Sequence, residues 1–106
     1  MEAALRAIAE PRRRQILVLV RDEELSAGEI AANFDVTRPA VSQHLTVLKE
    51  AGLIAERRDG TRRLYRARPE GLNALKEFLE EFWDDRLGKL KRLAEQKEKR
   101  KHGRHD

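Results

Sequence analysis

The sequence has no cysteine among its 106 residues. This absence excludes disulfide bonds, thiolate metal sites and cysteine nucleophiles in this chain. No apolar run approaches the ~20 residues that a membrane-spanning helix needs, and the opening MEAALRAIAEPRRR lacks the apolar core and cleavage site of a secretory signal. We therefore expect one cytoplasmic domain, because domains usually have ~100 to 200 residues.

Residues that commonly carry catalysis are also scarce. Ser26 and Ser42 are the only serines, and Ser26 stands where a helix cap is expected. Ser42 and His44 are two positions apart on a predicted helix, so their side chains point in different directions. No glycine-rich phosphate loop is present, and His102 and His105 have no cysteine or ordered carboxylate beside them. The sequence predicts neither an enzyme nor a metal site.

Charged residues, by contrast, are abundant and unevenly placed. The chain has 23 Lys and Arg against 19 Asp and Glu, a net charge of +4 and a pI near 9.8. Residues 38–68 hold eight basic and three acidic residues, a net charge of +5, and so do residues 89–106. Residues 69–88 hold two basic and six acidic residues, a net charge of −4. Clustered positive charge indicates an anionic partner.

Three helices are predicted in the first third of the chain. Residues 2–9 form an alanine-rich helix that ends before Pro11, and Pro11 suits the first turn of a second helix that reaches about Arg21. Ser26 followed by Glu29 is a capping box, in which each side chain accepts a hydrogen bond from the other residue's backbone N–H. A third helix is therefore expected to begin at this point.

A fourth helix is predicted after a tight turn at residues 34–36. Thr37 is a good N-cap, the helix spans residues 38–50, and Gly52 suits the left-handed position that ends it. Its buried stripe has helical spacing and consists of Val41, Leu45 and Leu48. Two helices joined by a short turn are typical of the helix-turn-helix motif.

A hairpin and a last helix complete the predicted order of helix, helix, helix, helix, strand, strand, helix. Residues 53–58 and 62–67 flank Asp59-Gly60, a dipeptide favoured in tight hairpin turns. Pro69 begins a helix whose long apolar stripe has little of its own chain to pack on, so we expect a dimer. We assign residues 1–96 to one mainly helical domain and residues 97–106, which lack apolar side chains, to a disordered basic tail.

The polar face of the fourth helix carries the most specific signal. An α-helix fits the major groove of DNA, where Gln pairs with adenine, Arg with guanine, and Ser or Thr with either. Residues 36–49 include no acidic residue; the alternative is an ordinary solvated face. Thr37, the expected N-cap, is included among the predicted contacts, and His44 lies near the edge of the polar face. The predicted contact residues are Thr37, Arg38, Ser42, Gln43, His44, Thr46 and Lys49.

Arginines dominate the predicted hairpin. Six of the twelve residues from 57 to 68 are arginines, which suits phosphate contact or insertion into a narrow minor groove. An edge strand protected from aggregation by its charge is the alternative, and Tyr65 is expected to pack rather than to stack on a base. The basic tail either adds nonspecific DNA affinity or serves only solubility. The predicted hairpin contacts are Arg57, Arg58, Thr61, Arg62 and Arg63.

Three segments together resemble the ArsR family of bacterial winged-helix repressors, particularly the branch that lacks metal sites. They are EPRRRQILVLV, LSAGEIAANFDVTRPAVSQHLTVLKEAGLI and ERRDGTRRLYRA, and the likeness covers residues 3–93. The resemblance implies a winged helix-turn-helix fold and a homodimer that binds an inverted-repeat operator, often its own promoter. It places the dimer interface on the first and last helices, at Leu5, Ile8, Leu72, Leu75, Leu79, Phe82, Trp83, Leu87 and Leu90.

The chain departs from the metal-sensing branches of that family at the positions of the metal ligands. Where the arsenic, cadmium and lead sensors have a Cys-x-Cys motif, this chain has Ser26 and Gly28. The zinc and nickel branches use Asp and His pairs on the last helix, and residues 69–95 contain no His. We therefore expect a repressor without a metal effector or cofactor. The alternatives are a winged-helix protein-interaction module and a sensor that a small ligand or metal releases from DNA.

Overall fold

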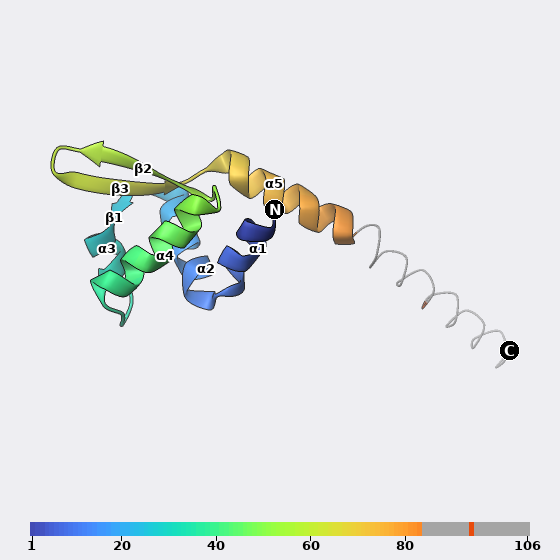
Figure 1. Cartoon of the computed structure of the whole chain (residues 1–106), viewed down its shortest axis with the longest axis horizontal. Helices are drawn as coiled ribbons and strands as arrows, with labels where there is room; N and C mark the ends of the chain where they lie inside the picture. The colour runs from blue at the N-terminus through green and yellow to red at the C-terminus, as the bar shows by residue number, and fades with distance from the viewer. Residues whose placement is uncertain (84–93, 95–106) are drawn as a thin grey trace, which may run out of the picture. The chain divides into compact units, whose positions relative to one another are not determined.

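The computed structural model describes residues 1–83 and residue 94, which form helices and a small sheet (Figure 1). The chain divides into two units, residues 1–75 and 76–106. The predicted tail, the domain boundary at residue 96 and the predicted interface residues Leu87 and Leu90 lie outside the described residues. The elements are α1 (Glu2–Ala9), α2 (Pro11–Asp22), β1 (Leu25–Ser26), α3 (Ala27–Ala32), α4 (Arg38–Glu50), β2 (Ile54–Asp59), β3 (Arg62–Ala67) and α5 (Pro69–Phe82).

The local signals at the ends of the helices are confirmed. The Ser26 backbone N–H donates to Glu29 Oε1 at 3.1 Å, and the Glu29 N–H donates to Ser26 Oγ at 3.2 Å, as a capping box requires. Thr37 caps α4 by accepting a hydrogen bond from the Ala40 N–H at 3.3 Å. Gly52, just after α4, has a φ of 75°. These contacts fix where α3 and α4 begin and where α4 ends.

The sheet has one strand that the sequence did not predict. Its order is β1-β3-β2 and all neighbours are antiparallel, with Leu25 opposite Tyr65. The predicted turn at Asp59-Gly60 is wrong by one residue, because Asp59 pairs with Arg62 and the loop is Gly60-Thr61. Only Gly60 has a positive φ there, of 65°, and a two-residue hairpin loop accepts this arrangement when glycine comes first.

A single apolar core joins the helices to the base of the hairpin. The predicted stripe of α4 is confirmed, because Val41, Leu45 and Leu48 are all buried. From α2, Ile16 and Val20 are buried, whereas Leu17 and Leu19 are only partly covered. The buried apolar residues are Ala4, Ala7, Ile16, Val20, Leu25, Ile30, Val41, Leu45, Leu48, Leu53, Ile54, Leu64 and Leu75.

The helix-turn-helix is formed by α3 and α4, which pack against each other beside the hairpin (Figure 1). Residues 54–67, called the wing below, leave the core just after the end of α4. The predicted mainly helical fold with a β-hairpin wing is therefore confirmed. In the described part of the chain, no helix has both the length and the apolar character needed to cross a membrane.

Candidate nucleic-acid interface

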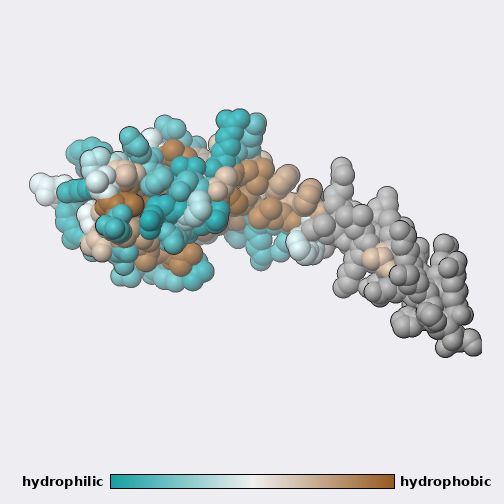
Figure 2. All heavy atoms as spheres, turned by 90° about the horizontal axis from the view of Figure 1, so that it is seen from below, coloured by the Kyte–Doolittle hydropathy of each residue, from teal (hydrophilic) through white to brown (hydrophobic). Residues whose placement is uncertain are grey.

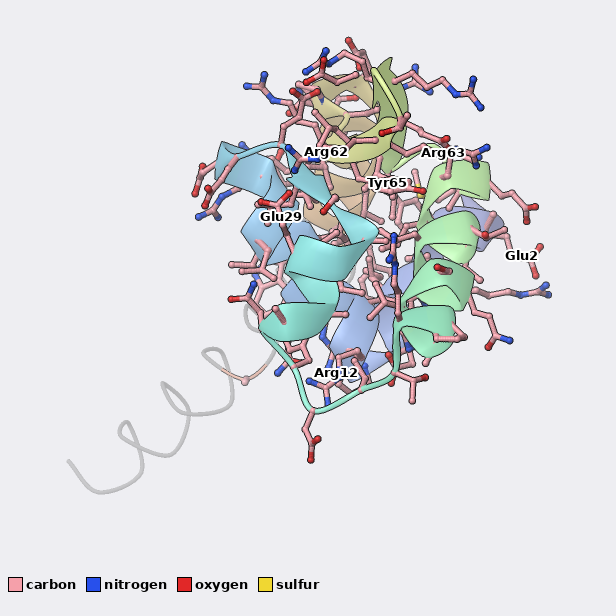
Figure 3. All side chains as sticks on the ribbon, turned by 90° about the vertical axis from the view of Figure 1, so that its left-hand side faces the viewer. Glu2, Arg12, Glu29, Arg62, Arg63 and Tyr65 are labelled. Atoms are coloured by element: carbon pink, nitrogen blue, oxygen red, sulfur yellow. The ribbon has the colours of Figure 1, made fainter. Side chains whose placement is uncertain are left out.

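The outer face of α4 presents polar side chains next to the wing. Figure 3 looks onto α3 and α4, with the wing above them. The burial pattern that sends Val41, Leu45 and Leu48 into the core turns the intervening residues outward. Of the predicted contact residues, His44 is half-buried and the exposed ones are Thr37, Arg38, Ser42, Gln43, Thr46 and Lys49.

Some of these exposed side chains already have partners within the chain. The Thr46 hydroxyl donates to the Ser42 carbonyl at 3.0 Å, and Lys49 Nζ lies 2.9 Å from Glu56 Oε2. Among the described residues, the side chains of Arg38 and Gln43 have no hydrogen-bonding or ion-pairing partner. The groups most available for reading bases are therefore at the first two turns of α4.

His44 has a contact that sequence reasoning missed. Its Nδ1 lies 3.4 Å from the Arg13 guanidinium, which also donates to the carbonyls of Ala7 at 2.7 Å and Arg6 at 3.1 Å. Arg13 thus satisfies carbonyl groups at the end of α1 that the helix itself leaves unpaired. The His44 side chain is directed toward Arg13 on α2. It therefore does not lie with the exposed polar side chains of α4. Only the tertiary fold brings these residues together.

Three wing arginines pair with carboxylates, two of which come from other parts of the chain. Arg57 donates to both carboxylate oxygens of Glu24, at 2.8 and 2.6 Å, and Arg62 donates to Glu29 at 2.5 Å. Arg63 lies 3.4 Å from Glu56, the same carboxylate that binds Lys49. Sequence analysis did not identify these carboxylates, because each of the first two pairs joins residues 33 positions apart.

These contacts lower the pKa values of the carboxylates that take part in them. Hydrogen bonds from Arg57 lower the pKa of Glu24 below its ordinary value of 4.5. Hydrogen bonds from the Ser26 backbone and hydroxyl, with a contribution from Arg62, lower the pKa of Glu29. The hydrogen bond from Lys49 lowers the pKa of Glu56 and raises that of Lys49. All three carboxylates are thus held in their charged form, Glu24 and Glu29 beside the wing and Glu56 within it.

Glu24→Gln is expected to make the stability of the protein less dependent on acid. Because the pKa of Glu24 is lower in the folded chain than its ordinary 4.5, its stabilising effect is present above pH 4.5. It is lost as the pH falls through the lowered value. Thermal unfolding followed by circular dichroism from pH 7 to pH 3 should show a smaller decline in melting temperature for Glu24→Gln. An equally steep decline would contradict the assignment.

The last helix carries the largest exposed apolar side chains among the described residues. Trp83 is 66% exposed and Phe82 is 52% exposed, and Leu79 and Phe78 are exposed to lesser degrees. Figure 2 shows apolar atoms gathered along the described part of α5. Leu75, in contrast, is only 7% exposed and belongs to the chain's own core. This corrects the prediction of Leu75 as an interface residue, because its own chain already covers it.

The other predicted interface residues in the first unit are partly buried. Leu5, Ile8 and Leu72 pack against the core without being fully covered. Phe78, which the sequence-based interface did not include, is 38% exposed. Within residues 1–83 and at residue 94, no three His, Asp or Glu side chains are grouped so that they could hold a metal ion.

Comparison with known proteins shows which family this chain belongs to. The profile described as "Bacterial regulatory protein, arsR family" matches residues 10–56, from the start of α2 into the wing. The HTH-type transcriptional regulator Rv2034 of Mycobacterium tuberculosis is 46% identical over 82 residues, which are 77% of this chain and 77% of that protein. The chain belongs to the ArsR family. It is a DNA-binding transcriptional regulator with a winged helix-turn-helix fold.

Other relatives include both a repressor and an activator of transcription. The transcriptional repressor SdpR of Bacillus subtilis is 40% identical over 60 residues, covering 57% of this chain and 67% of that protein. The transcriptional activator HlyU of Vibrio cholerae is 34% identical over 79 residues, covering 74% and 73%. These relatives are bacterial regulators of transcription, and they are not named as enzymes.

Solved structures agree with the fold. A crystal structure of a possible transcriptional regulator for arsenical resistance is 44% identical, with a TM-score of 0.74 over 82% of this chain and 91% of that one. The solution structure of the homodimeric winged helix-turn-helix DNA-binding domain of Mb0332 from Mycobacterium bovis is 32% identical. Its TM-score is 0.65 over 81% of this chain and 80% of that one.

Proposed function

We propose that this ArsR-family protein is a homodimeric repressor that binds an inverted-repeat operator, including one in its own promoter. It acts in the cytoplasm and needs no metal effector. One observation carries the proposal: α4 presents Arg38 and Gln43 without partners in the described chain, next to an arginine-rich wing. Guanidinium and amide groups are the side-chain groups that pair bidentately with guanine and adenine in the major groove. The wing supplies the positive charge that phosphates require.

The dimer is supported by the exposed apolar side chains of α5. Leu79, Phe82 and Trp83 together form an apolar surface that water solvates poorly. A homodimeric protein with the same fold supports the formation of a dimer. Two α4 helices related by a twofold axis would then enter successive major grooves, with half-sites about 10 to 10.5 base pairs apart.

Repression without a metal is supported by the relatives and by the start of α3. The repressor SdpR is a relative of this chain. Ser26 and Gly28 stand where the resemblance to metal sensors places thiolates, and the Ser26 hydroxyl already caps α3. We propose that this start of α3 has a structural rather than a metal-binding role. Addition of metal ions to the DNA complex is the direct test, and release of DNA would favour the sensor alternative.

Selection of bound sequences from a random DNA pool tests the proposed function. We expect enrichment of a pseudo-palindrome with half-sites about 10 to 10.5 base pairs apart, and repression of a reporter that carries the selected sequence. A single unpaired half-site would argue against the dimer. Equal binding of selected and random DNA would favour the protein-interaction module instead, and an activated reporter would reverse the sign of regulation.

Gln43→Ala is expected to cost about 1 to 3 kcal/mol of discrimination between the operator and a variant changed at one adenine, because a bidentate base contact is lost. Arg62→Ala should instead weaken binding to every sequence and reduce the salt slope by about one. Fluorescence anisotropy at several salt concentrations measures both effects. If Gln43→Ala weakens all sequences equally, Gln43 does not read a base.

A further inference from the structure

A cavity of about 500 Å³ lies between α3, α4 and the wing. The first turn of α3 closes one side, and the remaining lining includes Arg38, Ser42, Thr61, Arg62, Arg63 and Tyr65. Figure 3 shows Arg62 on the α3 side of the wing, Arg63 on the α4 side and Tyr65 between them. This volume falls within the range of about 300 to 1,000 Å³ that is typical of small-molecule sites, so a single anionic group with bound water fits.

The lining is chemically one-sided. It contains three guanidinium groups and the hydroxyls of serine, threonine and tyrosine side chains, but no carboxylate. Guanidinium groups bind phosphate through two parallel N–H donors, and hydroxyls donate to the remaining oxygens. The three arginines come from two separate elements, α4 and the wing, so their charges meet at this cavity only in the folded chain.

The carboxylates that contact these arginines do not balance their charge. Arg62 is paired with Glu29, which lies outside the cavity lining. Glu56 serves both Arg63 and Lys49, and Arg38 has no ion pair within the described residues. At least one positive charge at the cavity is therefore uncompensated, and an anion placed among the three guanidinium groups would relieve their mutual repulsion.

We propose that this cavity is a phosphate-binding site and that Arg62 exchanges its ion pair with Glu29 for the bound phosphate. The phosphate comes either from the DNA backbone, in which case the inference rests on the proposed function, or from a free phosphorylated ligand. Glu29 then acts as a positioning residue. Its carboxylate holds the Ser26 cap at the start of α3 and keeps Arg62 at the edge of the cavity until the phosphate arrives.

Glu29→Gln separates the two roles of Glu29. Glutamine at this position still completes a capping box, but it no longer competes for Arg62 by charge. Glu24→Gln is the matched control, because it releases Arg57, which does not line the cavity. A second matched pair is Arg63→Gln against Arg58→Gln, since these arginines are opposite each other in the wing and only Arg63 lines the cavity.

The first measurement titrates the full ¹⁵N-labelled chain with inorganic phosphate, with sodium chloride keeping the ionic strength constant. We expect saturable amide shifts at the starts of α3 and α4 and in the wing. Glu29→Gln should tighten phosphate binding by about twofold to fivefold, the effect of one exposed ion pair, and Glu24→Gln should leave it unchanged. Arg63→Gln should weaken it by about tenfold, and Arg58→Gln should weaken it much less.

The second measurement identifies the source of the phosphate. Operator DNA in which single phosphates are replaced by neutral methylphosphonates is bound to the wild-type chain and to Arg63→Gln. If one replacement per half-site weakens the wild type but has no further effect on Arg63→Gln, the cavity holds a DNA phosphate. If no replacement behaves in this way and inorganic phosphate displaces DNA at constant ionic strength, the cavity takes a free phosphorylated ligand.

The proposal is overturned if inorganic phosphate does not saturate, if Glu29→Gln and Arg63→Gln match the wild type, and if no methylphosphonate couples to Arg63. Selective operator binding would persist in that case, so the proposed function would stand. Conversely, saturable phosphate binding without operator selectivity would support the site while removing the proposed function. Circular dichroism of each variant confirms that the comparison is made between folded proteins.

Discussion

Replacing Gly71 with alanine is expected to lower the free energy of unfolding by about 3 kcal/mol, the upper part of the usual range for overpacking. A Cβ at this position would lie 2.0 Å from the Gly52 carbonyl oxygen and 2.9 Å from its carbonyl carbon. Both are backbone atoms, so no side-chain rotation removes the overlap. Gly52 has a φ of 75° and ends α4, so relief requires movement of that turn or of the start of α5.

Gly28→Ala is the matched control for Gly71→Ala. The nearest atoms to a Cβ at Gly28 are 4.0 Å away, and alanine is favoured over glycine inside a helix by roughly 0.5 to 1 kcal/mol. Urea unfolding followed by circular dichroism should show Gly71→Ala destabilised and Gly28→Ala unchanged or slightly stabilised. If Gly71→Ala unfolds at the same urea concentration as the wild type, the close approach of α5 to the end of α4 is wrong.

Leu48→Ala is expected to lower the free energy of unfolding by about 2 to 5 kcal/mol. Leu48 is fully buried, and its side chain anchors α4 in the core. Truncation removes apolar contacts and leaves a cavity that its neighbours cannot fill completely. The neighbouring Val47→Ala change serves as the control, because Val47 is 37% exposed on the same helix, and we expect it to cost less than about 1 kcal/mol.

Equilibrium urea unfolding measures the Leu48 and Val47 variants on the same scale. DNA binding by Leu48→Ala should fall in proportion to the unfolded fraction and recover at lower temperature, because Leu48 is buried beneath the face of α4 that we propose contacts DNA. Similar destabilisation by both variants would mean that α4 is oriented differently from the structure. Loss of DNA binding by a fully folded Leu48→Ala protein would show that the packing of Leu48 also sets the orientation in which α4 contacts DNA.

Sequence patterns predicted the elements whose causes are local. The Ser26 and Glu29 capping box, the Thr37 cap and the glycine after α4 act through backbone groups a few residues away. Helical spacing likewise identified the buried stripe of α4, because residues three and four apart share one face. The Asp59-Gly60 dipeptide also predicted the hairpin, and the residue types on the polar face of α4 predicted a DNA-reading surface.

Features that depend on distant residues could not be obtained in this way. Strand β1 has only two residues and exists through its pairing with β3, so it leaves no periodic signal. The hairpin register moved the turn by one residue, because pairing of Asp59 with Arg62 placed Gly60 first in the loop. Leu75 followed the apolar stripe of α5 but proved to belong to the core.

The sequence by itself determined the order of the five helices and the hairpin, the ends of α3 and α4, and the positive charge of residues 38–68. These follow from local hydrogen bonds, apolar spacing and composition. Only the tertiary structure decided which arginines are held by Glu24, Glu29 and Glu56, and that two of these arginines, Arg62 and Arg63, meet Arg38 at one cavity. The reason is physical: electrostatic contacts depend on distance in space, and the fold brings side chains 33 residues apart within hydrogen-bonding range.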